Sequence, residues 1–458
     1  MKTTHYPLIK KSLFLSFLTI LNFSFAQQDG GISPKTGKKI EPKFAPTIGI
    51  QSEFSYKMME QNQNLRKTMI LLEQRREGAL SNRSLTIGTS LISIVDYQKS
   101  NTQDKFGYLM RHPTSANQLG KEVSEVVIHS FQLSTTMAVN NWISAYADIL
   151  YCPEQSFGAG TITALARNQL QLRKGFVVLG DLKSFPLYAS IGKMDVNFGQ
   201  TGSVNPFTNS TLWHAFGCLG YGGEFGFKKW GLNASFTAVQ GGAQFRALQT
   251  VVGDSSNVPS VVNNYTIDIN QTFNTSDEQI TFRLGGSYVN GTSYSHSFPV
   301  KHFAPTKMNN PAWAAYLEMV VMDRFTLMGS YAETVKEWPG TFNPNPPLDT
   351  FPASKVSSIQ VGAKFDFNPN GNTIFSLSSE WSNFKAGPAG SPWERQNQFV
   401  VGFNALVNKS SRLFIEYFNT AGYSPLNFIS GGNLAPGVTW SERGASSNGF
   451  VLGAQINL

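Results

Sequence analysis

Hydrophobic and polar residues alternate along the chain from residue 84 to its last position. In one such segment Ile359, Val361 and Phe365 fall on one face, while Gln360 and Lys364 fall on the other. Successive side chains of a β-strand point to opposite sides, so this period of two predicts strands with one apolar and one polar face. The chain is therefore expected to be all-β beyond residue 83.

Two kinds of connection separate the alternating segments. Short ones are rich in turn-forming residues, and long ones are rich in Gly, Pro, Ser and Asn. The segments predict sixteen strands, at 84–97, 125–138, 141–151, 167–180, 186–198, 219–228, 231–240, 262–273, 279–290, 312–322, 325–335, 355–367, 373–384, 396–407, 411–420 and 447–458.

An even number of antiparallel strands, with short turns at one end and long loops at the other, is typical of a bacterial outer-membrane barrel. Lipid offers no hydrogen-bond partner, so the sheet of such a barrel closes on itself. We therefore expect residues 84–458 to form a transmembrane antiparallel β-barrel of about sixteen strands, preceded by a short periplasmic helix. A water-soluble β-sandwich is the alternative.

The first 26 residues predict a secretory signal peptide. Lys2, Lys10 and Lys11 precede an apolar run, and small residues lead to a cleavage site between Ala26 and Gln27. No later run of about 18 apolar residues follows, so no helix is expected to span a membrane.

Residues 27–51 are polar and rich in Gly, Pro and Lys, which predicts a periplasmic tether. Residues 52–80 lack Gly and Pro up to Glu77, and Met58, Leu65 and Leu72 are spaced by seven. This spacing predicts a short coiled-coil-like helix, through which the protein would form a homotrimer. A plain amphipathic helix that lies against the rest of the protein is the alternative.

The composition supports an ordered, exported protein. Only 14% of residues are charged, whereas 41% are hydrophobic and 13% are aromatic. So much apolar side chain excludes a disordered chain. The formal net charge of +8 is not gathered into a basic stretch, so no nucleic-acid partner is expected.

The chain stops at the end of its last predicted strand. Apolar residues occupy every second position there: Phe450, Leu452, Ala454, Ile456 and Leu458. This ending resembles the C-terminal assembly signal of outer-membrane proteins, with Leu458 in place of the usual Phe. The resemblance implies the barrel assembly machinery and outer-membrane lipid as partners.

A barrel of sixteen strands encloses a lumen wide enough for water and a solute, so a channel is the expected function. The polar strand faces place charges of both signs on the lumen wall, which does not favour an anion-selective pore. The alternative for each residue is a solvated wall position, including internal Lys193–Asp195 and Arg412–Glu416 salt bridges. The candidate lumen residues are Arg173, Lys193, Asp195, Arg283, Lys364, Glu380, Arg412 and Glu416.

The loop at 199–217 contains no Lys, Arg, Asp or Glu. It carries the aromatic side chains of Phe207, Trp213, His214 and Phe216. Such a loop could fold into the lumen as a constriction, and an outward-facing loop is equally allowed.

Two cysteines, Cys152 and Cys218, follow the signal peptide. The predicted topology places both at the long-loop end of the barrel, and an exported chain meets an oxidising compartment. We expect a disulfide that ties the 199–217 loop to the rim, with two unpaired thiols as the alternative.

No arrangement of residues predicts catalysis. Histidines do not combine with Ser and an acid in a catalytic pattern, and metal-binding, phosphate-binding and dinucleotide-binding motifs are absent from the sequence. We therefore expect no enzyme, with no catalytic residues, no metal and no cofactor.

Two central segments carry a resemblance to a known family. They are PLYASIGKMDVNFGQ (Pro186 to Gln200) and NPFTNSTLW (Asn205 to Trp213), which follow a signal peptide and a short helix. Together they resemble LbtU-type siderophore porins, TonB-independent outer-membrane barrels of intracellular gamma-proteobacteria. The resemblance implies ferric-siderophore uptake, and residues 27–83 are too few for a globular plug. A general or sugar-type diffusion porin and a structural or adhesive surface barrel are the alternatives.

Overall fold

The structure is a computed structural model. It describes residues 47–63, 65–101, 121–151, 170–242, 260–277, 279–292, 294, 309–338, 341–342, 350–351, 353–385, 387–390, 394–422 and 444–458. The predicted signal peptide, its cleavage site at Ala26 and Gln27, and most of the predicted tether lie outside the described residues.

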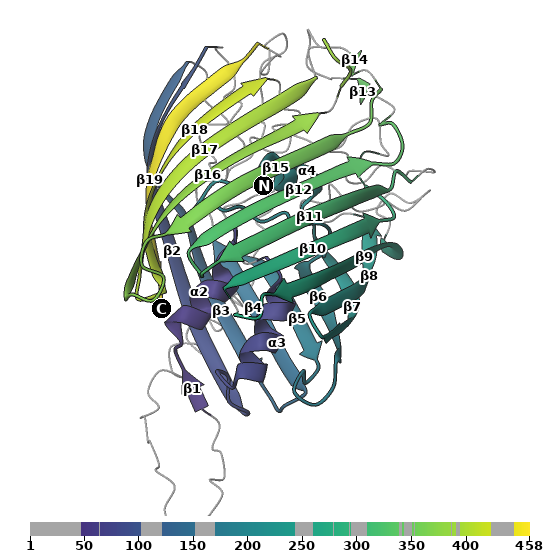
Figure 1. The fold of residues 1–458 in the computed structure, drawn as a ribbon, viewed down its shortest axis with the longest axis vertical. Coiled ribbons are helices and arrows are strands. Elements are labelled where there is room, and N and C mark those ends of the chain that lie inside the picture. The colour runs from purple at the N-terminus through teal and green to yellow at the C-terminus, as the bar shows by residue number, and fades with distance from the viewer. Residues whose placement is uncertain are drawn as a thin grey trace, which may run out of the picture. The chain divides into compact units, whose positions relative to one another are not determined.

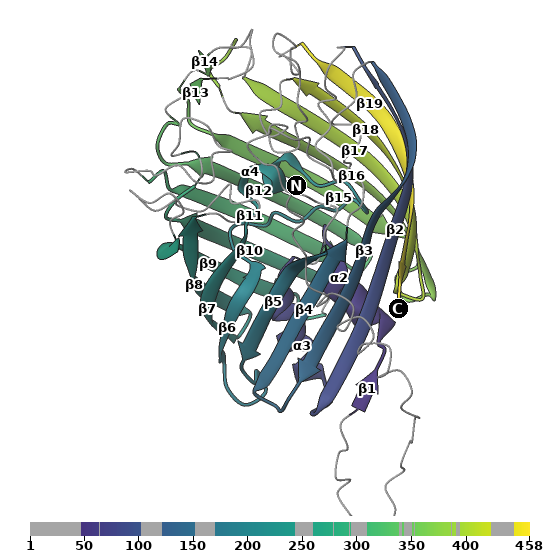
Figure 2. The same cartoon turned by 180° about the vertical axis from the view of Figure 1, so that it is seen from behind.

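Sixteen antiparallel strands form one closed sheet (Figures 1 and 2). Each strand pairs with its neighbour in the chain, and β19 pairs with β2 to close the ring. The prediction of an all-β antiparallel barrel is confirmed. The strands are β2 (Ser84–Ser100), β3 (Glu122–Ala138), β4 (Ile143–Tyr151), β5 (Gln171–Leu179), β6 (Leu187–Asp195), β7 (Leu219–Lys229), β8 (Leu232–Gly242), β9 (Ser260–Asn274), β10 (Ile280–Val289), β11 (Ala312–Val321), β12 (Phe325–Thr334), β15 (Ser357–Asp366), β16 (Thr373–Lys385), β17 (Arg395–Val407), β18 (Ser411–Gly422) and β19 (Ser446–Asn457).

Three further short strands are described outside the ring of sixteen. β13 (Thr341–Phe342) and β14 (Thr350–Phe351) pair with each other between β12 and β15. β1 (Thr47–Gly49) runs parallel to the start of β2.

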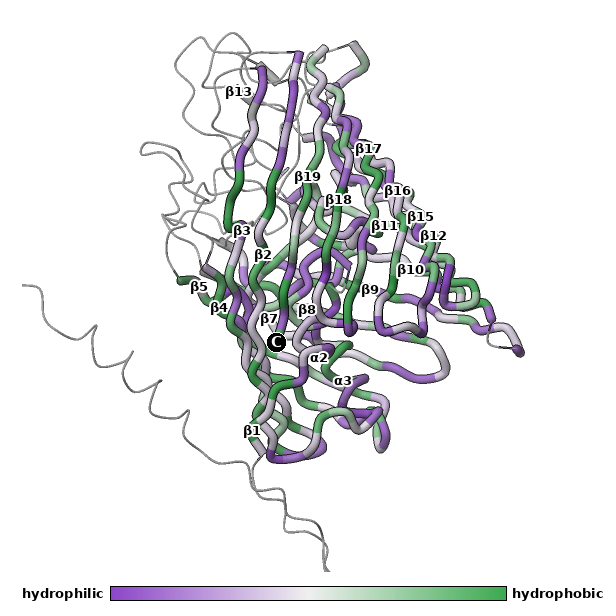
Figure 3. Tube along the Cα trace, turned by 90° about the vertical axis from the view of Figure 1, so that its left-hand side faces the viewer, coloured by the Kyte–Doolittle hydropathy of each residue, from purple (hydrophilic) through white to green (hydrophobic). Residues whose placement is uncertain are grey.

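The outer face of the barrel is apolar and the inner face is polar. On β17 and β18, Phe399, Phe403 and Ile415 are exposed, whereas Gln398 and Glu416 are buried inside. Figure 3 shows the same alternation of hydrophobic and hydrophilic positions along the strands. A closed barrel with an apolar outer face suits lipid, and the protein belongs in the bacterial outer membrane.

The end of the chain follows this pattern. Phe450, Leu452, Ile456 and Leu458 have exposed side chains on the outer face, and Ala454 lies in the same row. These five residues are therefore placed to contact lipid at the barrel seam.

Short turns gather at one end of the barrel. Met322 and Asp323 between β11 and β12, and Asn408 and Lys409 between β17 and β18, all have positive φ. Two successive residues of positive φ fit the twist of a tight hairpin. The strand ends that the long connections join lie at the opposite end, so the short-turn end is the periplasmic end.

The N-terminal segment, residues 47–83, enters the barrel from this periplasmic end. Its two helices, α2 (Ser52–Met59) and α3 (Lys67–Glu77), lie behind β3 and β4 in Figure 2, on the inner side of the sheet. Within the described part of the chain, no helix is long and apolar enough to cross a membrane. α2 crosses so close to β2 that a Cβ atom at Gly88 would overlap Ser55.

An apolar cluster holds the N-terminal segment against the inner wall. The cluster joins the segment to wall residues of β3 to β6, and its members are Phe54, Met58, Met69, Leu71, Leu72, Leu80, Ala138, Tyr146, Phe176, Val178, Tyr188 and Met194. An apolar patch on the inner wall of a barrel is shielded from water only when something covers it, so the segment is an integral part of the lumen.

The prediction of one coiled-coil-like helix over 52–80 is wrong. Residues 60–66 separate two short helices, and Leu65 lies in that break. Met58 and Leu72 are buried inside their own barrel, so they are not available to a second copy. The amphipathic alternative describes the segment better.

The N-terminal segment still fills part of the lumen. Its 37 residues are too few for a globular plug. They pack against the inner wall and bind a loop that folds inward from the wall, as described below.

Replacing Leu71 by Ala tests this packing. The buried Leu71 side chain leaves a cavity when truncated, so we expect a loss of about 2–5 kcal/mol in the free energy of unfolding. Urea titration in lipid vesicles measures it. Leu91→Ala, on the lipid face of β2, is the control and is expected to cost less, and equal losses would contradict the packing described here.

Candidate functional site

The connection between β6 and β7 folds into the lumen. We call residues 196–218 the inner loop. Its one helix, α4 (Thr211–Phe216), begins at Ser210, whose side chain accepts a hydrogen bond from the amide of Trp213 at 3.1 Å. α4 packs against β12, β15 and β16 of the wall. The inner loop therefore crosses the lumen instead of extending outward from the rim.

Two wall carboxylates bind the backbone of the inner loop. Glu416 accepts hydrogen bonds from the amides of Phe207 at 2.7 Å and Thr208 at 3.0 Å, and from the Thr208 hydroxyl. Glu380 accepts one from the amide of Val204 at 3.1 Å. A buried carboxylate that accepts several N–H bonds is well satisfied without a cation beside it.

Aromatic contacts fix the loop to the wall. Phe207 stacks on Phe414 of β18, with ring centroids 5.2 Å apart. Phe216 packs against Tyr294 at 5.7 Å. The loop passes close to β17, where a Cβ atom at Gly402 would lie 2.8 Å from Pro206. A backbone without a side chain allows this approach.

Arg412 joins the wall to both the inner loop and the N-terminal segment. Its guanidinium donates to the carbonyl of Pro206 at 2.7 Å and to the hydroxyl of Tyr56. It also donates to the side chain of Gln63 at 3.3 Å, and it lies 3.9 Å from the carboxylate of Glu60. Both terminal nitrogens of the guanidinium therefore donate to groups inside the barrel.

The N-terminal segment and the inner loop also bind each other directly. The side-chain amide of Gln63 donates to the backbone carbonyls of Val204 and Asn205, at 3.0 and 3.3 Å. The backbone of Ser203 donates to the carbonyl of Asn62 at 2.9 Å. The two chain segments therefore form one partition across the lumen.

A second wall site holds the other side of this partition. Arg66 donates two hydrogen bonds to Asp268 of β9, at 2.8 and 3.0 Å, and one to the hydroxyl of Tyr316 at 2.9 Å. Burial opposes the charge of Arg66, but Asp268 and Tyr316 outweigh burial and raise its pKa above the usual range. Asp268 also accepts from Ser287, which in turn accepts from the amide of Gly199.

A cavity of about 490 Å³ remains beside the partition. It lies between the N-terminal segment, the inner loop and strands β7 to β11. Its apolar side comes from the segment and the loop, with Leu65, Met69, Ile70, Val196, Phe198 and Trp213.

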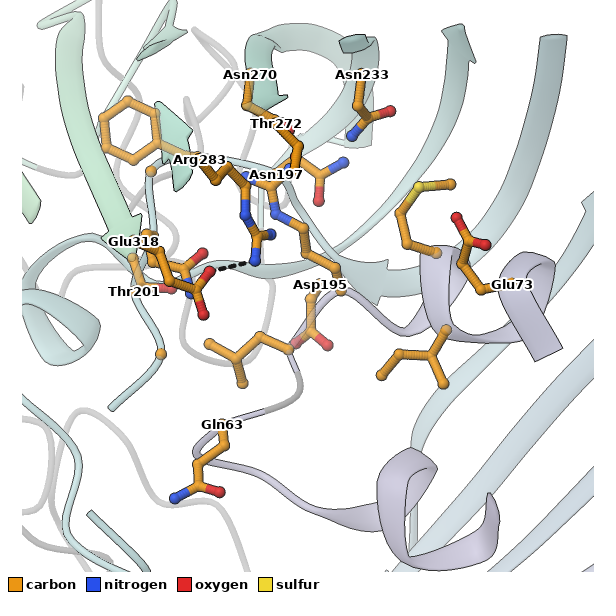
Figure 4. A pocket seen from close by; sticks show the side chains of 18 of the residues that line it. Gln63, Glu73, Asp195, Asn197, Thr201, Asn233, Asn270, Thr272, Arg283 and Glu318 are labelled. Carbon is orange, nitrogen blue, oxygen red and sulfur yellow. Dashed lines mark hydrogen bonds and ion pairs between the residues drawn. The ribbon is translucent and has the colours of Figure 1, made fainter. Parts of the chain in front are cut away.

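The opposite side of the cavity is polar. Amides and hydroxyls of the wall line it, from Asn233, Asn270, Thr272 and Thr281, and Asn197 of the inner loop adds a further amide to the lining. Figure 4 shows the ion pair of Arg283 and Glu318 on this polar side. It also shows Glu73 and Gln63, which belong to the N-terminal segment. Ionic side chains of both signs complete the lining: Lys57, Arg66, Glu73, Asp195, Lys228, Arg283 and Glu318.

Five candidate lumen residues lie on the inner face. Arg283 lines the cavity, Lys364 pairs with Asp366 at 3.1 Å, and Glu380, Arg412 and Glu416 hold the partition. Arg412 and Glu416 each bind the inner loop instead of forming the predicted bridge.

Lys193 was predicted to line the lumen, but it lies on the outer face of β6. It pairs in register with the exposed Tyr221, and its ammonium lies 5.7 Å from that ring. Asp195 pairs with Lys174, a buried residue that was not among the predicted lumen residues. Arg173 sits beside Lys174 at a bulge in β5. The predicted Lys193–Asp195 bridge is not formed.

The four aromatic residues predicted to form a constriction lie in different surroundings. Phe207 and Phe216 are buried anchors, whereas Trp213 lines the cavity and packs edge-on against His214. Within the described residues, no group of His, Cys, Asp and Glu side chains is placed to hold a metal ion.

The predicted disulfide is not formed at Cys218. This residue is a free, buried thiol that packs against Val196 and Val239. Its predicted partner, Cys152, lies outside the described residues. Burial, with Asp195 nearby, raises the pKa of the Cys218 thiol to about 12.

Asp268→Asn tests the hold of the wall on the partition. It leaves the buried Arg66 without its counter-charge, which costs about 3–5 kcal/mol in buried pairs. We expect the N-terminal segment to loosen and single-channel conductance in planar bilayers to rise.

Asp366→Asn is the matched control for this experiment. It removes an ion pair from the inner face of β15 that touches neither the N-terminal segment nor the inner loop. Equal conductance in both variants would contradict a holding role for Asp268.

Thiol labelling tests the place of Cys218. In a Cys152→Ser variant, we expect maleimide to label Cys218 slowly at pH 7.5 in the folded barrel and rapidly after unfolding, because the thiolate is the reactive form. Mass spectrometry measures the labelled fraction. Rapid labelling of the folded barrel would show that the thiol is not buried.

The comparisons with known proteins agree with this architecture. No family model matches the sequence. A UPF0422 protein of Coxiella burnetii is 21% identical over 351 residues, which cover 74% of this chain and 68% of that protein.

A solved porin structure shares the fold. An anion-selective porin of Comamonas acidovorans superposes with a TM-score of 0.50 at 13% identity, covering 82% of this chain and 99% of the porin. At this identity the likeness is one of fold alone. The outer-membrane channel DcaP of Acinetobacter baumannii superposes with a lower TM-score of 0.46 at 12% identity, with the same coverage.

Proposed function

We propose that this protein is an outer-membrane channel for small polar solutes. The observation that carries the proposal is the cavity of about 490 Å³ inside a closed barrel, lined on one side by amides and hydroxyls. The solute would pass between the partition and strands β7 to β11. Cavities of about 300–1,000 Å³ are the size that holds small organic molecules.

The charges of the cavity support a path without strong preference for anions. Arg283 pairs with Glu318, and Lys228 pairs with Glu73. Arg66 pairs with Asp268. Since each of these cations has an acid beside it, the lining presents no row of unpaired positive charge to an anion.

Ferric-siderophore uptake is the finer hypothesis that the family resemblance implies. The partition supports a selective channel over a wide diffusion pore, because it crosses the lumen beside the cavity. We place small polar solutes first, since the lining of the described residues is mixed and a bulky metal complex would require the partition to move. A homotrimer stays a proposal, and its contacts would come from the outer face.

Thr272→Trp tests the path. Thr272 lies on the cavity wall, where it is the partner of Arg283 on the neighbouring strand. An indole side chain at this position would fill part of the cavity. We expect swelling of proteoliposomes in arabinose to slow by at least about threefold, since the channel narrows with the added side chain.

Ser93→Trp is the control, because Ser93 lies on the lipid face of β2 in register with Ile128. It should swell at the wild-type rate. An unchanged swelling rate in Thr272→Trp would show that the solute does not pass through this cavity. A wild-type barrel that passes no solute and no ions would favour a structural or adhesive surface barrel.

A further inference from the structure

The Arg283–Glu318 pair faces the cavity and keeps unused hydrogen-bonding capacity. Among the described residues, Glu318 is the one hydrogen-bond partner of the Arg283 side chain. A guanidinium has five N–H donors, so most of those of Arg283 are available to a solute. The two side chains are 33% and 20% exposed, so both can be reached from the cavity.

A further carboxylate faces the same cavity from another wall. Asp195, at the end of β6, is 24% exposed although it pairs with Lys174. Glu73 of the N-terminal segment also lies at the cavity, but its carboxylate oxygens are buried between Arg76 and Lys228. A solute in the cavity therefore meets the Arg283–Glu318 pair on one wall and the carboxylate of Asp195 on another (Figure 4).

We infer that the cavity selects zwitterionic solutes that carry an apolar group, meaning free amino acids or short peptides. The inference rests on the proposed channel function and names its substrate class. The carboxylate of the solute would bind the free N–H groups of Arg283, and its ammonium would bind Glu318 or Asp195. The apolar side of the cavity, with Leu65 and Met69, would cover the side chain.

Other solute classes fit these groups less well. A net anion meets repulsion from Glu318 and Asp195, and a net cation meets repulsion from Arg283 and Lys228. A neutral sugar or amide finds hydrogen bonds but uses none of the charges. A zwitterion that leaves water in a narrow lumen recovers charge-assisted hydrogen bonds at both of its ends.

Uptake by proteoliposomes at low solute concentration tests the inference. L-alanine is the zwitterionic probe, lactamide is a neutral molecule of similar size, and lactate is the matching anion. At low concentration the rate reflects how favourably a solute enters the channel. We expect wild-type protein to take up alanine about fivefold faster than lactamide or lactate, the range that charge-assisted contacts give.

The double variant Arg283→Gln with Glu318→Gln removes the pair without leaving an unpaired charge. We expect its alanine-to-lactamide ratio to fall toward one. The control, Lys364→Gln with Asp366→Asn, removes an inner-face pair outside the cavity lining and should keep the wild-type ratio. The shift in gel mobility on heating checks that each barrel is folded.

The outcomes separate this inference from the proposed function. If alanine and lactamide enter the wild-type vesicles at the same rate, the zwitterion preference is wrong and the channel stands. If the double variant keeps a raised wild-type ratio, the assignment of the preference to Arg283 and Glu318 is wrong. If none of the three solutes enters the vesicles, the proposed channel function itself is overturned.

Discussion

Irregular backbone inside a barrel must find hydrogen-bond partners, and this constraint governs the lumen. The inner loop cannot use the ladders of the sheet, because the strands already pair with each other. Side chains of the wall replace them: Glu416 and Glu380 accept from its amides, and Gln398 donates to the carbonyl of Asn209 at 2.7 Å. Charged and amide residues of the inner face therefore serve as a scaffold as much as a surface for solutes.

The same constraint explains why so wide a barrel keeps so small a cavity. The inner loop crosses the lumen with backbone N–H and C=O groups that the sheet does not pair. The N-terminal segment binds some of these groups through the side chain of Gln63 and the carbonyl of Asn62. Asp268 and Arg412, on distant strands, then anchor the two sides of the partition. Selectivity would arise from how the lumen is filled, while the number of strands sets only the space to be filled.

The period of two was enough to predict all sixteen strands, because burial on one face acts locally on each strand. The place of the N-terminal segment could not be predicted, since Arg66 finds its partner 202 residues away. Lys193 was assigned to the lumen because it is charged, yet its side chain lies on the same outer face as the exposed Ile191. A long cationic side chain near a strand end can reach polar surroundings from the outer face. Glu318 lies on the polar face of its strand, so the alternation could have predicted it as a lumen residue.

The ring closes between its first and last strands, where Gln455 of β19 reaches Ser90 of β2 across 365 residues of chain. Contacts so distant in sequence form late in folding, because loop-closure entropy opposes them. Until then the inner side of β2 would be bare. The contacts of α2 with β2 join neighbouring parts of the chain, as where Ser55 meets Gly88. The N-terminal segment can thus cover the inner side of β2 while the ring is still open, well before any solute needs a path.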